Sequence, residues 1–224
     1  MLAQGITYNT TMALVAGIVP LLILVFARVA QQPDRSSIES WGWVFAALGL
    51  FLSVTGTHMV LTWPLAQIPK APCCRVDNVT FGEPAMFYGY LILFTGIAII
   101  RAERLELNHG RTFDLVNTVR PFLYAGAFGG FGLILIAVAG IHNGMWSPPP
   151  DEPIAGLFTG MFLEPLYIAS AYTLTGVAAI LAPFAPEKRI IARIFVVVLF
   201  IVGLMWLFIA MTVYYGHVGY FFTS

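Results

Sequence analysis

Residues 194–216 read IFVVVLFIVGLMWLFIAMTVYYG, a run of 23 residues without a charged side chain. A helix rises about 1.5 Å per residue, so about 20 apolar residues cross the roughly 30 Å hydrocarbon core of a bilayer. This run is therefore long and apolar enough to be a membrane-spanning helix. It also decides the fold class, because five more charge-free stretches precede it. They are residues 1–27, 40–69, 84–100, 121–150 and 165–186.

Charged residues are few in this 224-residue chain, and they are clustered. They make up 10% of it against 59% hydrophobic residues, whereas a soluble domain carries about 25% charged residues. They fall in five windows, residues 28–39, 70–83, 101–120, 151–164 and 187–193. We therefore predict an all-α membrane protein with a single transmembrane domain over residues 1–224. Its six helices are expected near residues 10–30, 41–64, 84–101, 120–142, 164–184 and 190–217.

The basic residues predict how the helices are oriented, because Lys and Arg are retained on the cytoplasmic side of a membrane. The first, third and fifth windows hold nine of the 11 Lys and Arg residues, and the second and fourth hold two. We therefore expect both chain ends outside and three outward-opening helical hairpins, in the plasma (inner) membrane of a prokaryote. The formal net charge of zero gives no indication of a nucleic-acid partner, so the lipid bilayer is the expected environment.

One short motif occurs twice in the same order, and each copy ends one apolar stretch and begins the next. The first copy is GTH at 56–58, WP at 63–64 and FGEP at 81–84, and the second is GIH at 140–142, WSP at 146–148 and FLEP at 162–165. We interpret this as a hairpin repeat over residues 83–142 and 164–217, in which each hairpin begins at the glutamate before a proline and ends at a histidine. A weaker third copy over residues 9–58 has Asn9 where the other two have an acid.

The repeated polar residues are candidate metal ligands, because the hairpins would bring them to one depth at the outer helix ends. Imidazole nitrogens and carboxylate oxygens in this number suit zinc, copper or iron. We predict a site for one to three ions, with zinc or copper favoured over iron, that supports metal-dependent redox or hydrolytic chemistry or a structural role. The predicted ligands are His58, Glu83, His142, Glu164 and His217, with Asn9 and Asp77 among the candidate further ligands or neighbours.

Three other interpretations of the same residues stay open. A carboxylate at a helix N-terminus and an imidazolium at a C-terminus each stabilise the helix dipole by about 0.3–1 kcal/mol, so helix capping explains either feature alone. Two of the outer histidines are also able to clamp a b-type haem, in a haem or quinone electron-transfer protein. A non-catalytic accessory subunit of a larger membrane complex, or a homo-oligomer, is the third. The role of Cys73 and Cys74 is open as well.

The segment from Gly56 to Gly89, with its runs GTHMVLTWPL and NVTFGEP, resembles a family of uncharacterised bacterial and archaeal membrane proteins, the domain of unknown function 981. The resemblance covers most of the chain. It implies a small polytopic membrane protein and supplies no activity, cofactor or site residue.

Overall fold

The computed structural model describes the backbone of residues 4–32, 37–64, 76–109, 114–146, 155–158 and 160–223. Within these ranges it describes the side chains except those of residues 4–8, 106–107, 109, 155, 158 and 217–223. All regular structure in the described ranges is helical.

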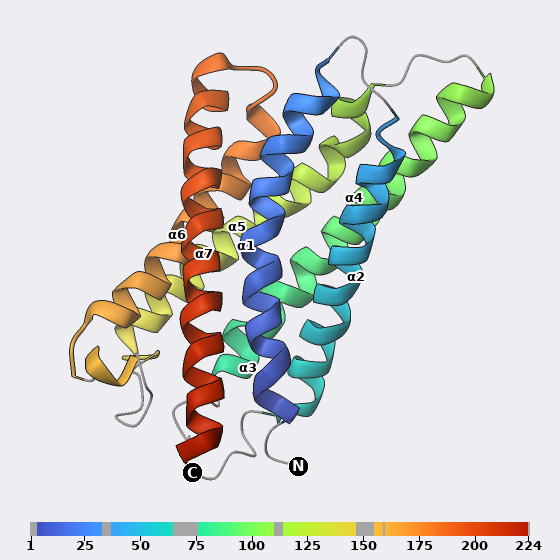
Figure 1. Cartoon of the computed structure of the whole chain (residues 1–224). Coiled ribbons are helices and arrows are strands. Elements are labelled where there is room, and N and C mark those ends of the chain that lie inside the picture. The colour runs from blue at the N-terminus through green and yellow to red at the C-terminus, as the bar shows by residue number, and fades with distance from the viewer. Residues whose placement is uncertain are drawn as a thin grey trace.

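In the described part of the chain, six long helices run from one end of the molecule to the other (Figure 1). All six are long and apolar enough to cross a membrane, which confirms the predicted fold class. Three short elements lie between them: α3 (Asp77–Thr80), η3 (Ala155–Phe158) and η4 (Ala182–Phe184). The long helices are α1 (Gln4–Ala30), α2 (Glu39–Thr62), α4 (Gly82–His109), α5 (Leu115–His142), α6 (Leu163–Leu181) and α7 (Arg189–Thr223).

Both copies of the repeated motif lie at the same end of the bundle, the lower end in Figure 1. Helices α2, α5 and α7 end there, and α1, α4 and α6 begin there. We call this the motif end, and we call the opposite end, with Arg28, Arg104 and Arg120, the arginine end. The side of the membrane that each end faces stays a prediction.

The six helices pack most closely as three antiparallel pairs, α2 with α4, α5 with α6, and α1 with α7. Glycine allows the close approach in the first pair, because a Cβ atom placed on Gly49 would lie 2.3 Å from the backbone nitrogen of Leu93. A Cβ atom on Gly89 would lie 2.4 Å from the nitrogen of Ser53. The two backbones are therefore in direct contact, as in other membrane helices with small residues at the interface.

The other two pairs also meet at glycine. A Cβ atom on Gly130 of α5 would lie 2.6 Å from the carbonyl oxygen of Gly176 in α6. A Cβ atom on Gly17 of α1 would lie 3.0 Å from the carbonyl oxygen of Gly203 in α7. The first and last helices are thus packed together, so the three pairs form a closed ring around a common centre.

Contacts between the pairs are sparser, and tyrosine hydroxyls take part in two of them, those of α4 with α5 and of α6 with α7. The hydroxyl of Tyr88 in α4 donates to the carbonyl of Gly126 in α5 at 2.9 Å, and that of Tyr167 in α6 donates to the carbonyl of Met205 in α7 at 3.2 Å. Each bond joins residues 38 positions apart. Each of the two predicted hairpins thus has a tyrosine hydrogen bond between its own two helices, in addition to the sequence motif. The closest packing nevertheless joins helices of different hairpins.

Charged residues fix α2 against α4 at the arginine end. Glu103 is buried and accepts hydrogen bonds from the hydroxyl of Ser37 at 3.0 Å and from the backbone N–H of Ile38 at 2.9 Å. It therefore satisfies a donor at the start of α2 that the helix itself leaves unpaired. On the surface beside it, Arg104 forms an ion pair with Glu39.

Candidate ligand cavity

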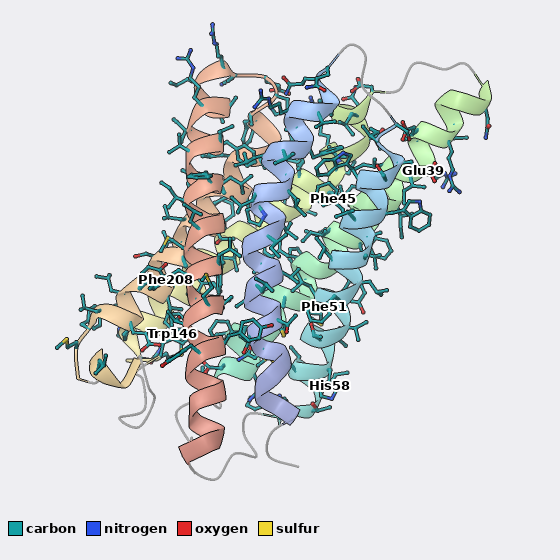
Figure 2. The ribbon with its side chains drawn as sticks, in the orientation of Figure 1. Glu39, Phe45, Phe51, His58, Trp146 and Phe208 are labelled. Carbon is teal, nitrogen blue, oxygen red and sulfur yellow. The ribbon has the colours of Figure 1, made fainter. Side chains whose placement is uncertain are left out.

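The predicted metal ligands occupy different environments at the motif end. His58, at the lower right of Figure 2, is exposed, as are Glu83 and His142. Glu164 is partly buried and lines an interior cavity. The side chain of His217 lies outside the described residues. In the part of the chain that is described, no three His, Cys, Asp or Glu side chains form a group able to hold a metal ion. The five-ligand metal site stays a prediction.

A cavity of about 780 Å³ lies at the centre of the ring of helices. All six long helices contribute to its wall, and most of the lining residues are apolar. The wall at the arginine end contains four phenylalanines, Phe26, Phe45, Phe122 and Phe195. Phe45 lies in the upper half of Figure 2 and Trp146 in the lower half, and both line the cavity. The cavity therefore extends through much of the length of the bundle.

Polar side chains gather where the cavity reaches the motif end. Asn9 comes from α1, Asp77 from α3, Glu164 from α6 and Thr212 from α7. Asn9, Asp77 and Glu164 lie near the starts of their helices there, and Thr212 lies in the last third of α7. The rest of the wall offers threonine hydroxyls, the phenols of Tyr88, Tyr167 and Tyr172 and the indoles of Trp146 and Trp206. The carboxylates and the amide of the wall are therefore at one end of the cavity, and most of its remaining length is apolar.

Four aromatic rings form a cluster in the cavity wall near this polar end. Trp146 stacks on Tyr172 with ring centroids 5.5 Å apart, and Trp206 meets the edge of Tyr172 at 5.3 Å. Phe81 lies 6.1 Å from Tyr172 and 6.4 Å from Trp206. These distances are typical of favourable aromatic pairs. We call Phe81, Trp146, Tyr172 and Trp206 the aromatic cluster.

The polar atoms of the aromatic cluster are engaged within the protein. The hydroxyl of Tyr172 donates to the carbonyl of Thr80 at 2.6 Å, and the indole N–H of Trp206 donates to the hydroxyl of Thr175 at 3.0 Å. The indole N–H of Trp146 lies 3.5 Å from the hydroxyl of Thr80. Because these donors are used, the cluster offers the cavity its ring surfaces rather than hydrogen bonds.

The two tryptophans of the repeated motif share an unusual backbone conformation. Trp63 has φ +48° and Trp146 has φ +64°, and they are the two described non-glycine residues with positive φ. A left-handed conformation costs roughly 1–2 kcal/mol per non-glycine residue. The side chains nevertheless differ, because Trp146 is 8% exposed in the cavity wall and Trp63 is 44% exposed. The two copies of the motif therefore share a positive φ at their tryptophans, whereas the surroundings of the two side chains differ.

The paired glutamates differ in the same way. Glu164, in the second copy of the motif, lines the cavity, and Glu83, in the first copy, is exposed. Sequence analysis identified both glutamates, Asn9 and Asp77, but it did not identify Thr212 or the aromatic cluster as parts of one site. The Trp-Pro and Phe-x-Glu-Pro segments were the available signal, because Trp146 and Phe81 belong to them.

The fold and the cavity define the class: a protein of the polytopic membrane type, with six long apolar helices in its described residues and an elongated, partly open apolar cavity between them. Within that class, the chain belongs to the family described as "Protein of unknown function (DUF981)", whose model matches residues 5–219. The match confirms the resemblance seen around the first motif. No curated protein and no solved structure matches the chain.

Proposed function

We propose that this protein binds a lipid-soluble molecule that has a long apolar chain and a small polar head. The central cavity supports this function. Its volume of about 780 Å³ falls within the range of roughly 300–1,000 Å³ that is usual for small-molecule sites. A mostly apolar lining with a few polar groups at one place is also typical of such sites.

The distribution of polar groups supports one orientation of the ligand. Asn9, Asp77, Glu164 and Thr212 surround the motif end of the cavity, and the arginine end is lined by phenylalanine. Burying a polar head among phenylalanine rings without hydrogen bonds would cost several kcal/mol, roughly 2–7 by transfer measurements. The head therefore lies at the motif end, and the chain extends toward the phenylalanines.

This function is related to the quinone alternative of the sequence analysis. It needs neither a haem nor a metal ion, and it uses one predicted ligand, Glu164, in a different role. Binding in the cavity also explains why a protein with so few residues outside its helices would carry partly buried polar side chains at one end of the helix bundle. Metal binding by His58, Glu83, His142, Glu164 and His217 remains a separate prediction that metal analysis of the purified protein tests.

Photolabelling tests the proposal directly. The protein is reconstituted in lipid nanodiscs with hexadecanol that carries a diazirine in its chain, irradiated, and digested for mass spectrometry. We expect labelled residues on cavity-lining segments of several helices, such as those containing Leu91, Leu123 and Leu199. Labels confined to residues that face the lipid, such as Phe128 and Leu135, would overturn the proposal.

A matched pair of variants distinguishes labelling by a probe inside the cavity from labelling by a probe in the surrounding lipid. Ala16→Phe places a ring into the cavity that Ala16 lines, so it is expected to reduce labelling of the cavity at least fivefold. Leu135→Phe changes a side chain that is 67% exposed and is expected to leave cavity labelling unchanged. Equal labelling of the cavity segments in both folded variants would argue that the probe reaches them from the lipid side.

A further inference from the structure

We propose that the ligand enters the cavity from the lipid bilayer, through a lateral portal between α6 and α7. The rim of this portal is formed by Leu163 and Tyr167 of α6 and by Phe208 of α7, and all three line the cavity. The inference rests on the proposed function and adds the route by which a lipid-soluble ligand reaches its site. It follows from the exposure of the rim, the course of the two helices and the contacts that join them.

Two residues of the rim belong both to the cavity wall and to the outer surface of the molecule. Leu163 is 56% exposed and Phe208 is 57% exposed, whereas every other described residue of the cavity wall is buried or partly buried. Residues three and four positions apart share one face of a helix. Phe208 shares its face with Leu204 and Met211, which are exposed and lie outside the cavity wall. The ring of Phe208 therefore lies at an edge of the wall, between the cavity and the lipid-facing surface.

The two helices separate toward the motif end. Figure 1 shows that α6 and α7 meet at the arginine end and that α6 then leaves α7 at an angle. Phe208 lies on the side of α7 that faces α6 (Figure 2). It precedes residue 217, where the described side chains of α7 end, by nine positions, about 13.5 Å along a helix that rises about 1.5 Å per residue. The portal is therefore within the apolar span, where a lipid-soluble ligand reaches it without passing through water.

Side chains make the described contacts across the portal, whereas α2 and α4 meet backbone to backbone. The rings of Phe208 and Tyr167 meet edge to face with centroids 5.7 Å apart, and the hydroxyl of Tyr167 donates to the carbonyl of Met205 at 3.2 Å. Side-chain rotamers change within nanoseconds and need no movement of a helix. Rotation of the two rings therefore opens the portal, while the hydrogen bond from Trp206 to Thr175 keeps α7 joined to α6.

Crosslinking before or after loading of the probe tests the portal. Tyr167→Cys and Phe208→Cys are combined in a Cys73→Ser, Cys74→Ser background, and the protein in nanodiscs is treated with a short bis-methanethiosulfonate that ties α6 to α7. Crosslinking before the hexadecanol probe is added is expected to reduce cavity labelling at least fivefold, and reduction of the crosslink is expected to restore it. Probe that is loaded first is expected to stay in the crosslinked protein during a chase with empty vesicles.

A second crosslink on α7 is the matched control. Thr11→Cys and Tyr214→Cys are combined in the same background and treated with the same reagent. The two hydroxyls lie 2.6 Å apart and join α1 to α7, and neither residue lines the cavity. This crosslink restrains α7 without crossing the portal, so cavity labelling is expected to stay at the level before crosslinking. An equal loss of labelling at both crosslinks would overturn the inference.

A substitution at the rim tests the portal without cysteines, and it serves if the crosslinking variant does not fold. Leu163→Trp narrows the opening from α6 and is expected to slow cavity labelling at least threefold, measured by light flashes at increasing times after the probe is added. Leu166→Trp changes a residue that is 49% exposed and outside the cavity wall, and it is expected to keep the wild-type rate. Equal rates in the two folded variants would contradict the portal.

The two proposals fail in different ways. If the probe labels the wild-type cavity and the crosslink between positions 167 and 208 leaves labelling unchanged, the portal is wrong and the lipid-binding function stands. If the probe does not label the cavity in the wild type, the lipid-binding function itself is wrong.

Discussion

The indole ring of Trp146 occupies the space that a side chain at Gly140 would need. A Cβ atom on Gly140 would lie 2.0 Å from one carbon of that ring and 2.2 Å from the next. The first glycine of the second motif is therefore required by its tryptophan. In the first motif Gly56 has another role, since a Cβ atom there would meet the backbone nitrogen of Met86 at 2.3 Å.

Gly140→Ala is expected to destabilise the protein by about 1–3 kcal/mol, because overpacking forces a buried ring from its position. For a chain of this size that corresponds to a fall in Tm of roughly 2–12 °C, measured by thermal unfolding in detergent. Gly132→Ala is the matched control on the same helix, since nothing lies within 4 Å of a Cβ atom there. Equal Tm values for the two variants would contradict the contact.

Gly49→Ala is expected to be more damaging, because its new Cβ atom would lie 2.3 Å from the nitrogen and 2.7 Å from the Cα atom of Leu93. Backbone atoms cannot rotate away as a side chain does, so α2 and α4 must separate along their contact. We expect a loss of at least about 3 kcal/mol, at the upper end of the usual overpacking range. Gly126→Ala serves as the control, because its nearest neighbours are side-chain atoms at 3.9 Å. A folded Gly49→Ala protein with the wild-type Tm would show that the helices are not in backbone contact.

Glu103→Ala is expected to destabilise the arginine end by about 1.5–3 kcal/mol, the usual range for hydrogen bonds to a charged group. The variant leaves the buried N–H of Ile38 without the carboxylate that accepts from it at 2.9 Å. Hydrogen exchange should therefore accelerate at the start of α2, with a fall in Tm. Glu103→Gln retains one acceptor oxygen and should lose less. Glu83→Ala, at an exposed position, should leave both measurements unchanged, and an equal effect there would contradict the capping role of Glu103.

The predicted orientation has a direct test in cells. In a Cys73→Ser, Cys74→Ser background, Asn143→Cys introduces an exposed thiol at the motif end and Pro186→Cys introduces one at the arginine end. A membrane-impermeant maleimide is expected to label position 143 in intact cells and position 186 only after permeabilisation. The reverse pattern would place the arginine end outside and contradict the distribution of Lys and Arg.

The distribution of charge was sufficient to predict the six helices, because a charge-free run of about 20 residues has few alternatives to crossing a bilayer. The end of α4 was predicted less well. The helix continues from Arg101 to His109, since Arg, Glu and Leu favour helix once the chain has left the apolar region. The first charged residues indicate where the membrane-spanning part of a helix ends. Helix propensity determines how far the helix continues beyond that point.

The cavity could not be predicted from the sequence. Glu83 and Glu164 occupy the same place in their motifs, as do Trp63 and Trp146, yet one member of each pair lines the cavity and the other is exposed. That difference arises from how the three helix pairs close on one another. The sequence motif predicts that the two copies are alike in local structure. The packing of the helix pairs determines which copy has its Trp and Glu side chains in the cavity wall.

The contact between α1 and α7 has a consequence for how the protein is made. During synthesis the N-terminal helix emerges first and α7 follows as the last of the six, and chains begin to fold before they are complete. The contact between Gly17 and Gly203 therefore cannot form until α7 has been synthesised. The hydrogen bond between Thr11 and Tyr214, at 2.6 Å, forms later, because Tyr214 follows Gly203 in the chain. The ring can close only after α7 has been inserted, so the cavity forms after all six of these helices are in the bilayer.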